Sequence, residues 1–176
     1  WNAAELTEER VLTGHTDWVR GLAVMSDGRQ LVSVSKDQTV RIWDLTTGAE
    51  LAVLKGHTGL INGVAVTPDG TKIVTASNDQ TARIWNANTG EEMATLRAGS
   101  AALMSAIFSP DGSKLGFVST DRFHKNSTAK LADTTNGEVR TLFTETEKTH
   151  VQTRVQWQIL WDSNEVLWYT QRDGTA

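Results

Sequence analysis

The sequence GHTDWVRGLAVMSDGRQLVSVSKDQTVRIWD at residues 14–44 recurs, 42 positions later, as GHTGLINGVAVTPDGTKIVTASNDQTARIWN at residues 56–86. The two stretches share an opening Gly-His pair, an Asp-Gln-Thr triplet and a closing Arg-Ile-Trp triplet. A Pro-Asp-Gly turn in the second stretch, at residues 68–70, recurs after the same interval at residues 110–112. Self-similarity at a fixed period indicates that the chain is built from repeated structural units.

Short apolar runs alternate with turn residues inside one unit, a pattern typical of antiparallel strands. Gly, Pro, Asn and Asp occupy the intervening turns, and no segment keeps a helical period. A unit of this length lies in the range for a four-stranded propeller blade. The fold class is therefore predicted as all-β, a β-propeller of four-stranded antiparallel blades. In the second unit the predicted strands lie at residues 64–66, 73–76, 81–85 and 92–96.

The repeated residues also resemble the motif of the WD-repeat family, over roughly residues 1–96. The resemblance rests on the Gly-His pair, a Ser or Thr, a turn Asp, and a Trp followed by Asp, which the second unit replaces with Asn86. It implies that four of these side chains form a hydrogen-bonded tetrad inside each blade. The implied tetrads are His15, Ser33, Asp37 and Trp43 in the first unit and His57, Thr75, Asp79 and Trp85 in the second.

His15, Ser33 and Asp37 are also the residue types of a hydrolase triad, in which a carboxylate orients the His that activates a serine. The same set recurs in the second unit, each time with a Trp at matching spacing. An active site is seldom copied at a fixed period, whereas a structural network must be. The pattern therefore favours a structural role, in which each lost buried hydrogen bond would cost about 1–3 kcal/mol.

The third unit departs from the motif. Its Gly-His position holds Ala98-Gly99, its hydroxyl position holds Phe117, and its Trp-Asp position holds Ala132-Asp133. About five extra residues enter between Asp121 and Lys130. We expect a blade-like unit with a longer hairpin and without the tetrad.

Residues 108–174 resemble the N-terminal propeller of dipeptidyl-peptidase-IV-like proteins. The resemblance rests on FSPDGSKL at residues 108–115 and on a tryptophan-rich ending at residues 157–161 and 165–174. Those peptidases carry their catalytic serine in a separate α/β-hydrolase domain, within a G-x-S-x-G turn that this sequence lacks. The resemblance therefore implies a scaffold without catalytic residues, and we expect no enzyme activity. The alternative is a propeller fragment of such a serine peptidase that lacks its hydrolase domain.

Two parts of one propeller domain are expected. Residues 1–97 would supply an outer strand and two full WD-repeat units, and residues 98–176 would supply divergent blades that end in two strands between residues 154 and 173. Together they make about four blades, of which the first and last are incomplete. Two families of blade in one short chain suggest a chimera, either natural or engineered as a propeller with no natural function.

An incomplete ring predicts self-association. Open strand edges leave backbone donors and acceptors unpaired, whereas a closed ring hides them. The simplest closure is a two-fold homodimer that approximates eight blades. A monomeric four-blade ring sealed by the N-terminal strand is the alternative.

Composition excludes several classes of function. The chain contains no cysteine, which removes disulfides and thiolate metal sites. Its net charge of −4 argues against nucleic-acid binding. No apolar run could cross a membrane and no signal peptide opens the chain, so a soluble and preferably cytoplasmic protein is expected. No cofactor or metal is expected, since His124 and His150 match no ligand spacing.

One face of the repeats is the candidate binding surface. Trp18 lies three residues after His15, at a position where WD-repeat proteins present side chains on the upper face of the ring. Aromatic residues and Arg dominate protein-binding hot spots, so a scaffold for protein or peptide binding is expected. The alternative is that Trp18 covers a neighbouring blade. The candidate face comprises Trp18, Arg20, Lys36, Gln38, Leu60, Asn62, Asn78 and Gln80, with Ala102 and Met104 as equivalents in the third unit.

Overall fold

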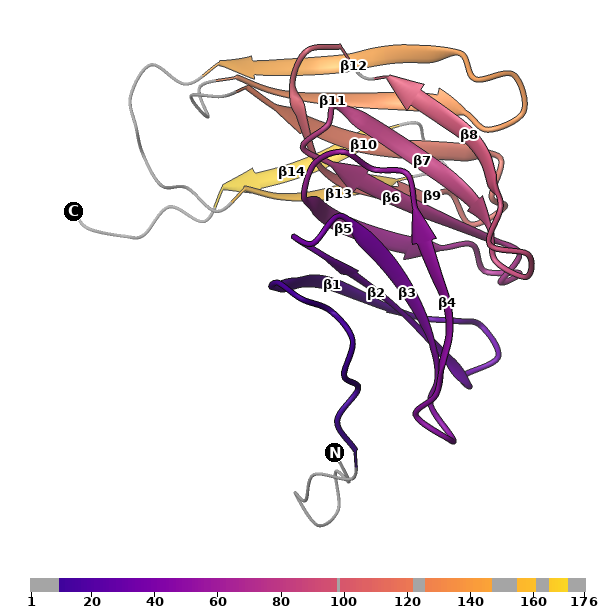
Figure 1. Ribbon diagram of the computed structural model, residues 1–176. Coiled ribbons are helices and arrows are strands. Elements are labelled where there is room, and N and C mark those ends of the chain that lie inside the picture. The colour runs from indigo at the N-terminus through magenta and orange to yellow at the C-terminus, as the bar shows by residue number, and fades with distance from the viewer. Residues whose placement is uncertain (1–9, 98, 122–125, 147–154, 161–164, 171–176) are drawn as a thin grey trace, which may run out of the picture.

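The computed structural model describes residues 10–97, 99–121, 126–146, 155–160 and 165–170. Every regular element in this part of the chain is a strand (Figure 1). The first sheet contains β1 (Val19–Val24), β2 (Gln30–Ser35), β3 (Thr39–Asp44) and β4 (Glu50–Lys55). The second contains β5 (Ile61–Val66), β6 (Lys72–Ser77), β7 (Thr81–Asn86) and β8 (Glu92–Arg97). The third contains β9 (Ala102–Phe108), β10 (Lys114–Thr120), β11 (Asn126–Asp133) and β12 (Val139–Thr146). A two-stranded sheet contains β13 (Val155–Leu160) and β14 (Glu165–Thr170).

Each four-stranded sheet is an antiparallel meander in which sequential strands are neighbours. Sequential strands can be neighbours because tight turns of a few residues reverse the chain between them. In the turn between β5 and β6, Gly70 adopts φ +71°, a conformation that glycine reaches without steric cost. The first strand of each sheet lies beside the first strand of the next, so the sheets spread like the blades of a fan (Figure 1). The prediction of an all-β propeller built from four-stranded blades is confirmed.

Apolar side chains from two neighbouring sheets fill each space between blades. We call the tetrad-bearing face of a sheet its front face and the opposite face its back face. Val32, Val34 and Ile42 on the back face of the first sheet pack against Ile73 and Trp85 on the front face of the second. A second cluster joins the back face of the second sheet to the front face of the third. The core is therefore divided into layers, one between each pair of blades.

The third sheet replaces the tetrad with apolar packing. Phe117 pairs with Lys130 in the register where Thr75 pairs with Arg83, so Phe117 occupies the hydroxyl position. Ala132 occupies the Trp85 position by the same comparison. The aromatic ring has moved to the neighbouring strand, and Phe117 is fully buried in the layer between the second and third sheets.

The register also confirms the insertion in the third unit. Thr75 and its partner Arg83 are eight positions apart in the chain, whereas Phe117 and its partner Lys130 are thirteen apart. The five additional residues lengthen the hairpin between β10 and β11, as the repeat offsets predict. Residues 122–125 of this hairpin lie outside the described residues.

The sequence predicts one outer strand near the N-terminus and two strands near the C-terminus. The two C-terminal strands are present as β13 and β14. The predicted outer strand at residues 1–13 falls mostly outside the described residues, and residues 10–13 form no strand. The described part of the chain contains no helix of a length and apolarity suited to crossing a membrane.

Candidate functional site

A chain of hydrogen bonds crosses the front face of the second sheet. The indole Nε1–H of Trp85 donates to Thr75 Oγ1 at 2.9 Å, and Thr75 Oγ1 lies 2.7 Å from His57 Nε2. His57 Nδ1 lies 2.7 Å from Asp79 Oδ2, which also accepts the backbone N–H of Thr58 at 3.0 Å. Because the indole can only donate, Thr75 Oγ1 accepts from Trp85 and its hydroxyl donates a hydrogen bond to Nε2, and His57 donates from Nδ1 to Asp79. The network thus fits a neutral His57.

The first sheet repeats this network with nearly the same geometry. Trp43 donates to Ser33 Oγ at 2.8 Å, His15 Nε2 lies 2.7 Å from the same oxygen, and His15 Nδ1 lies 2.9 Å from Asp37 Oδ2. Asp37 also stabilises its own turn, because its Oδ1 accepts a hydrogen bond from Thr39 Oγ1 at 2.6 Å. Two repeats separated by 42 residues therefore build one arrangement twice.

The tetrads resemble a hydrolase triad in residue types but lack access for a substrate. The nucleophile position would be Ser33 Oγ or Thr75 Oγ1, and both residues are buried. Each oxygen also accepts an indole N–H and is thereby already engaged. A nucleophile must reach a bound substrate, so this geometry suits a structural network rather than acyl transfer.

Burial and hydrogen bonding set the charges of the second tetrad. Burial lowers the pKa of His57 below its ordinary 6.5, and this effect outweighs the opposing hydrogen bond that His57 donates to Asp79. Burial alone would raise the pKa of Asp79, but hydrogen bonds from Thr81, His57 and Thr58 lower it to about 2. Burial would also raise the pKa of Asp37, but hydrogen bonds from Thr39, Thr16 and His15 together lower it. Near neutral pH the network pairs a neutral imidazole with an ionised carboxylate.

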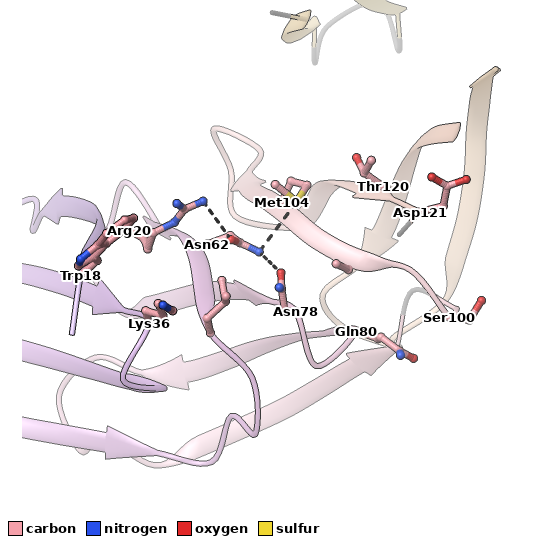
Figure 2. Close-up of a pocket in the computed structure, with 12 residues that line it drawn as sticks. Trp18, Arg20, Lys36, Asn62, Asn78, Gln80, Ser100, Met104, Thr120 and Asp121 are labelled. Atoms are coloured by element: carbon pink, nitrogen blue, oxygen red, sulfur yellow. Dashed lines mark hydrogen bonds between the residues drawn. The ribbon is translucent and has the colours of Figure 1, made fainter. Parts of the chain in front are cut away.

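A groove opens where the first strands of the three sheets begin. It encloses about 560 Å³, and side chains from all three sheets line it (Figure 2). Seven of the eight residues of the predicted binding face lie on its walls, and Gln38 does not. The third sheet adds residues from β9 and from the end of β10. The lining consists of Trp18, Arg20, Lys36, Leu60, Asn62, Asn78, Gln80, Ser100, Ala102, Met104, Thr120 and Asp121.

Three of these lining residues were missed from the sequence. Thr120 lies 42 positions after Asn78, so the repeat offset carries a signal for it. Asp121 and Ser100 stand where the motif of the third unit has degraded, and no comparable signal marks them as groove residues. Asp121 accepts a hydrogen bond from Asn126 Nδ2 at 2.7 Å, which anchors it to the start of β11.

Asn62 connects the three sheets at the floor of the groove. Its Nδ2 donates to Asn78 Oδ1 at 2.6 Å and to the carbonyl oxygen of Leu103 at 2.8 Å. Its Oδ1 accepts a long hydrogen bond of 3.4 Å from Arg20 Nη2. Figure 2 shows Arg20, Asn62 and Asn78 joined in a row along the groove. This amide fixes the side chains around it and so gives the groove a defined shape.

No metal centre is found within the described ranges, where no three His, Asp or Glu side chains gather closely enough to hold an ion. The two histidines considered as ligands from the sequence, His124 and His150, lie outside the described residues. The candidate site therefore comprises the groove and the tetrads.

Stacked four-stranded sheets with a recurring His, Asp, hydroxyl and Trp network define a β-propeller with WD-repeat blades. The family model "WD domain, G-beta repeat" matches residues 6–44 and 48–86. The model "Dipeptidyl peptidase IV (DPP IV) N-terminal region" matches residues 72–176, which is more than half of the chain. The chain belongs to this dipeptidyl peptidase IV N-terminal family, with WD repeats in its first half.

Curated relatives match single repeats. Nuclear distribution protein nudF of Aspergillus niger is 48% identical over 42 residues, which is 24% of this chain and 10% of the relative. Nuclear distribution protein PAC1 of Yarrowia lipolytica is 55% identical over 38 residues, 22% of this chain and 9% of the relative. The chain thus matches about a tenth of the length of these relatives.

A solved structure supports the fold. The structure of U3-55K aligns with a TM-score of 0.70 at 24% identity, over 76% of this chain and 42% of that chain. At this identity the similarity concerns the fold alone. It confirms the propeller arrangement of the described sheets.

Proposed function

We propose that this chain is a non-catalytic propeller scaffold that binds a segment of another protein in the groove lined by Trp18, Asn62 and Met104. The observation that carries the proposal is the exposure of Trp18, whose side chain is 71% exposed at the rim of a concave, three-sheet groove. Large aromatic side chains at such positions are typical binding hot spots. WD-repeat proteins generally bind other proteins, which supports the same role here.

A catalytic role has less support. The hydroxyls that resemble nucleophiles are buried and engaged with indole donors. The match to the dipeptidyl peptidase IV N-terminal region supports the alternative that this chain is the propeller part of a serine peptidase. Such a peptidase would need a hydrolase domain with a G-x-S-x-G turn elsewhere in its gene. The two family matches in one short chain also support a chimeric origin, with residues 1–97 and 98–176 forming one propeller.

Selection from a random peptide library displayed on phage tests the proposal. Enriched peptides are synthesised with a fluorescent label, and their affinities are measured by anisotropy. We expect the substitutions Trp18→Ala and Leu60→Ser, at two sides of the groove, to weaken binding at least tenfold, or about 1.4 kcal/mol. Leu51→Ala, at an exposed position on the outer strand β4, is the matched control and should leave affinity unchanged. Peptides that bind equally well to the Trp18 and Leu60 variants would refute the groove as the site.

We further propose that a second copy of the chain covers the front face of the first sheet. Val19, Leu22 and Val24 on this sheet are 50%, 62% and 57% exposed. Ile61, the equivalent of Val19 in the second repeat, is 0% exposed because the first sheet packs against it. Among the described residues, no sheet packs on this face of the first sheet as one does on the second and third, and a sheet of another copy supplies the matching surface.

Light scattering over a concentration series tests this association. A dimer would give twice the 19.3 kDa of one chain, consistent with a ring approaching eight blades. The variant Leu22→Glu should shift the mass to one chain, while Leu51→Glu on the outer strand should not. A wild-type mass of one chain at all concentrations would contradict the proposal and favour a monomeric ring.

A further inference from the structure

The repeat places one triplet of side chains at equivalent positions in each of the three sheets, and the three triplets differ sharply in charge. The first triplet carries two cations and an aromatic ring, the second is neutral and mainly amide, and the third is neutral and mainly apolar. All nine side chains line the same groove, which therefore has a cationic end at the first sheet and no cation among its lining residues at the third. The triplets are Trp18, Arg20 and Lys36, then Leu60, Asn62 and Asn78, then Ala102, Met104 and Thr120.

Most of the polar side-chain groups at the cationic end are hydrogen-bond donors. The Oδ1 of Asn62 already accepts from Arg20, and the Oδ1 of Asn78 already accepts from Asn62. The remaining group of Asn78 is its NH₂, which donates no side-chain hydrogen bond within the described part of the chain. Arg20 and Lys36 carry only donors as well. A ligand group that accepts hydrogen bonds therefore matches this end best.

The neighbouring charges leave this end positive. An oxygen of the Asp17 carboxylate lies 3.8 Å from Lys36 Nζ, so Asp17 pairs with Lys36. Lys36 Nζ also lies 5.4 Å from the centre of the Trp18 ring, so ammonium and indole form one surface. Two cations against one carboxylate leave a local positive charge on a chain whose net charge is −4. The acidic lining residue Asp121 lies across the groove on the third sheet, as Figure 2 shows.

We propose that the groove recognises an acidic protein segment, with an Asp or Glu carboxylate at Arg20, Lys36 and Asn78. An apolar neighbour of that carboxylate packs on Trp18, and a second apolar side chain occupies the end near Met104. Carboxylates form charge-assisted hydrogen bonds with Arg and Lys, and these are about twice as strong as neutral ones. This assignment of ligand chemistry rests on the proposed function of the groove and adds the class of segment that it selects.

A matched peptide mixture tests the assignment. Each member of an equimolar set of acetylated and amidated decapeptides carries neutral residues, apart from one position made in Glu, Gln, Lys and phosphoserine versions. The set is passed over the immobilised full chain, and the retained peptides are counted by mass spectrometry. We expect Glu versions to be enriched about tenfold over their Gln twins at low salt, an advantage that falls as salt rises from about 0.02 M to about 0.5 M.

Two variants locate this preference. We expect two variants, Arg20→Gln alone and Arg20→Gln combined with Lys36→Gln, to retain Glu peptides no better than their Gln twins. Both variants should still retain neutral apolar peptides. Arg29→Gln removes the same charge from an exposed turn beyond the far end of β1 and should leave the advantage intact. Unchanged thermal melting shows that each variant is folded.

The outcomes separate the two proposals. Retention of peptides without any preference for Glu, or a preference that survives in the double variant, would overturn the acidic assignment and leave groove binding intact. A phosphoserine version retained in place of Glu would move the recognised group to phosphate and would also overturn it. No retention of any peptide would overturn groove binding, and the acidic assignment with it.

Discussion

Truncation of the indole in the second tetrad should cost more stability than the same change in the first. Trp85 and Trp43 are each only 2% exposed, and each donates to the hydroxyl of its own tetrad. Trp85 belongs to the apolar cluster between the first and second sheets, whereas Trp43 belongs to no described cluster. Trp85→Ala should therefore destabilise the chain by about 3–5 kcal/mol, the usual range for large aromatic truncations.

Trp43→Ala should destabilise the chain by about 1–2 kcal/mol less than Trp85→Ala, because the Trp43 side chain does not pack in the cluster between neighbouring sheets. The assay is urea unfolding followed by circular dichroism and by fluorescence, with coincident transitions as the test of two-state behaviour. Trp18→Ala is the matched control, and as an exposed position it should stay within about 0.5 kcal/mol of wild type. A Trp85 variant destabilised by less than about 1 kcal/mol would refute the reasoning about the tetrads. So would a Trp43 variant that is the less stable of the two.

Further expectations concern pH, one turn and the third sheet. The lowered pKa of His57 means that the folded chain binds its proton less readily than the unfolded chain, so stability should fall as pH drops below about 6.5. His57→Gln should remove this slope in urea midpoints, whereas a flat wild-type profile from pH 7.5 to 5.5 would contradict the assignment. Asp79, with a pKa of about 2, should keep its contribution until pH falls below its unfolded value near 3.8 and lose it toward 2. Gln80 adopts φ 72°, so Gln80→Val should cost about 1–2 kcal/mol and Gln80→Asn should not destabilise; equal melting temperatures for both would count against backbone strain. Phe117→Ala should cost about 3–5 kcal/mol by calorimetry, and a loss below about 1 kcal/mol would show that its ring does not support the third sheet.

Much of the fold could be predicted from the repeat. The period located four strands in the second unit, and β5 to β8 contain all four predicted ranges. The tetrad residues were identifiable through the resemblance to the WD-repeat motif, whose residue types His57, Thr75 and Asp79 match. The same resemblance placed Trp18 on the binding face, and the repeat offset extended that face to the equivalent positions of the second unit.

The rest depended on contacts that a repeat does not encode. The sequence showed that Phe117 and Ala132 break the tetrad. Only the register shows that the aromatic side chain lies at the hydroxyl position on β10, while alanine takes the tryptophan position on β11. Asn62 joins the first and third sheets through hydrogen bonds to Arg20 and to the carbonyl oxygen of Leu103, and residue type alone does not predict these bonds. Gln38 was placed on the binding face by its offset, yet it lies outside the groove lining.

Binding in the groove is the central claim, and the indole signal of Trp18 tests it most directly. Amide NMR spectra of the labelled chain are recorded during titration with a phage-selected peptide, and Trp18→Phe identifies the relevant indole N–H signal by its loss. The account predicts that this signal shifts with saturation, while the indole signals of Trp43 and Trp85, buried in their tetrads, stay in place. A bound peptide that leaves the Trp18 signal unmoved would contradict the claim.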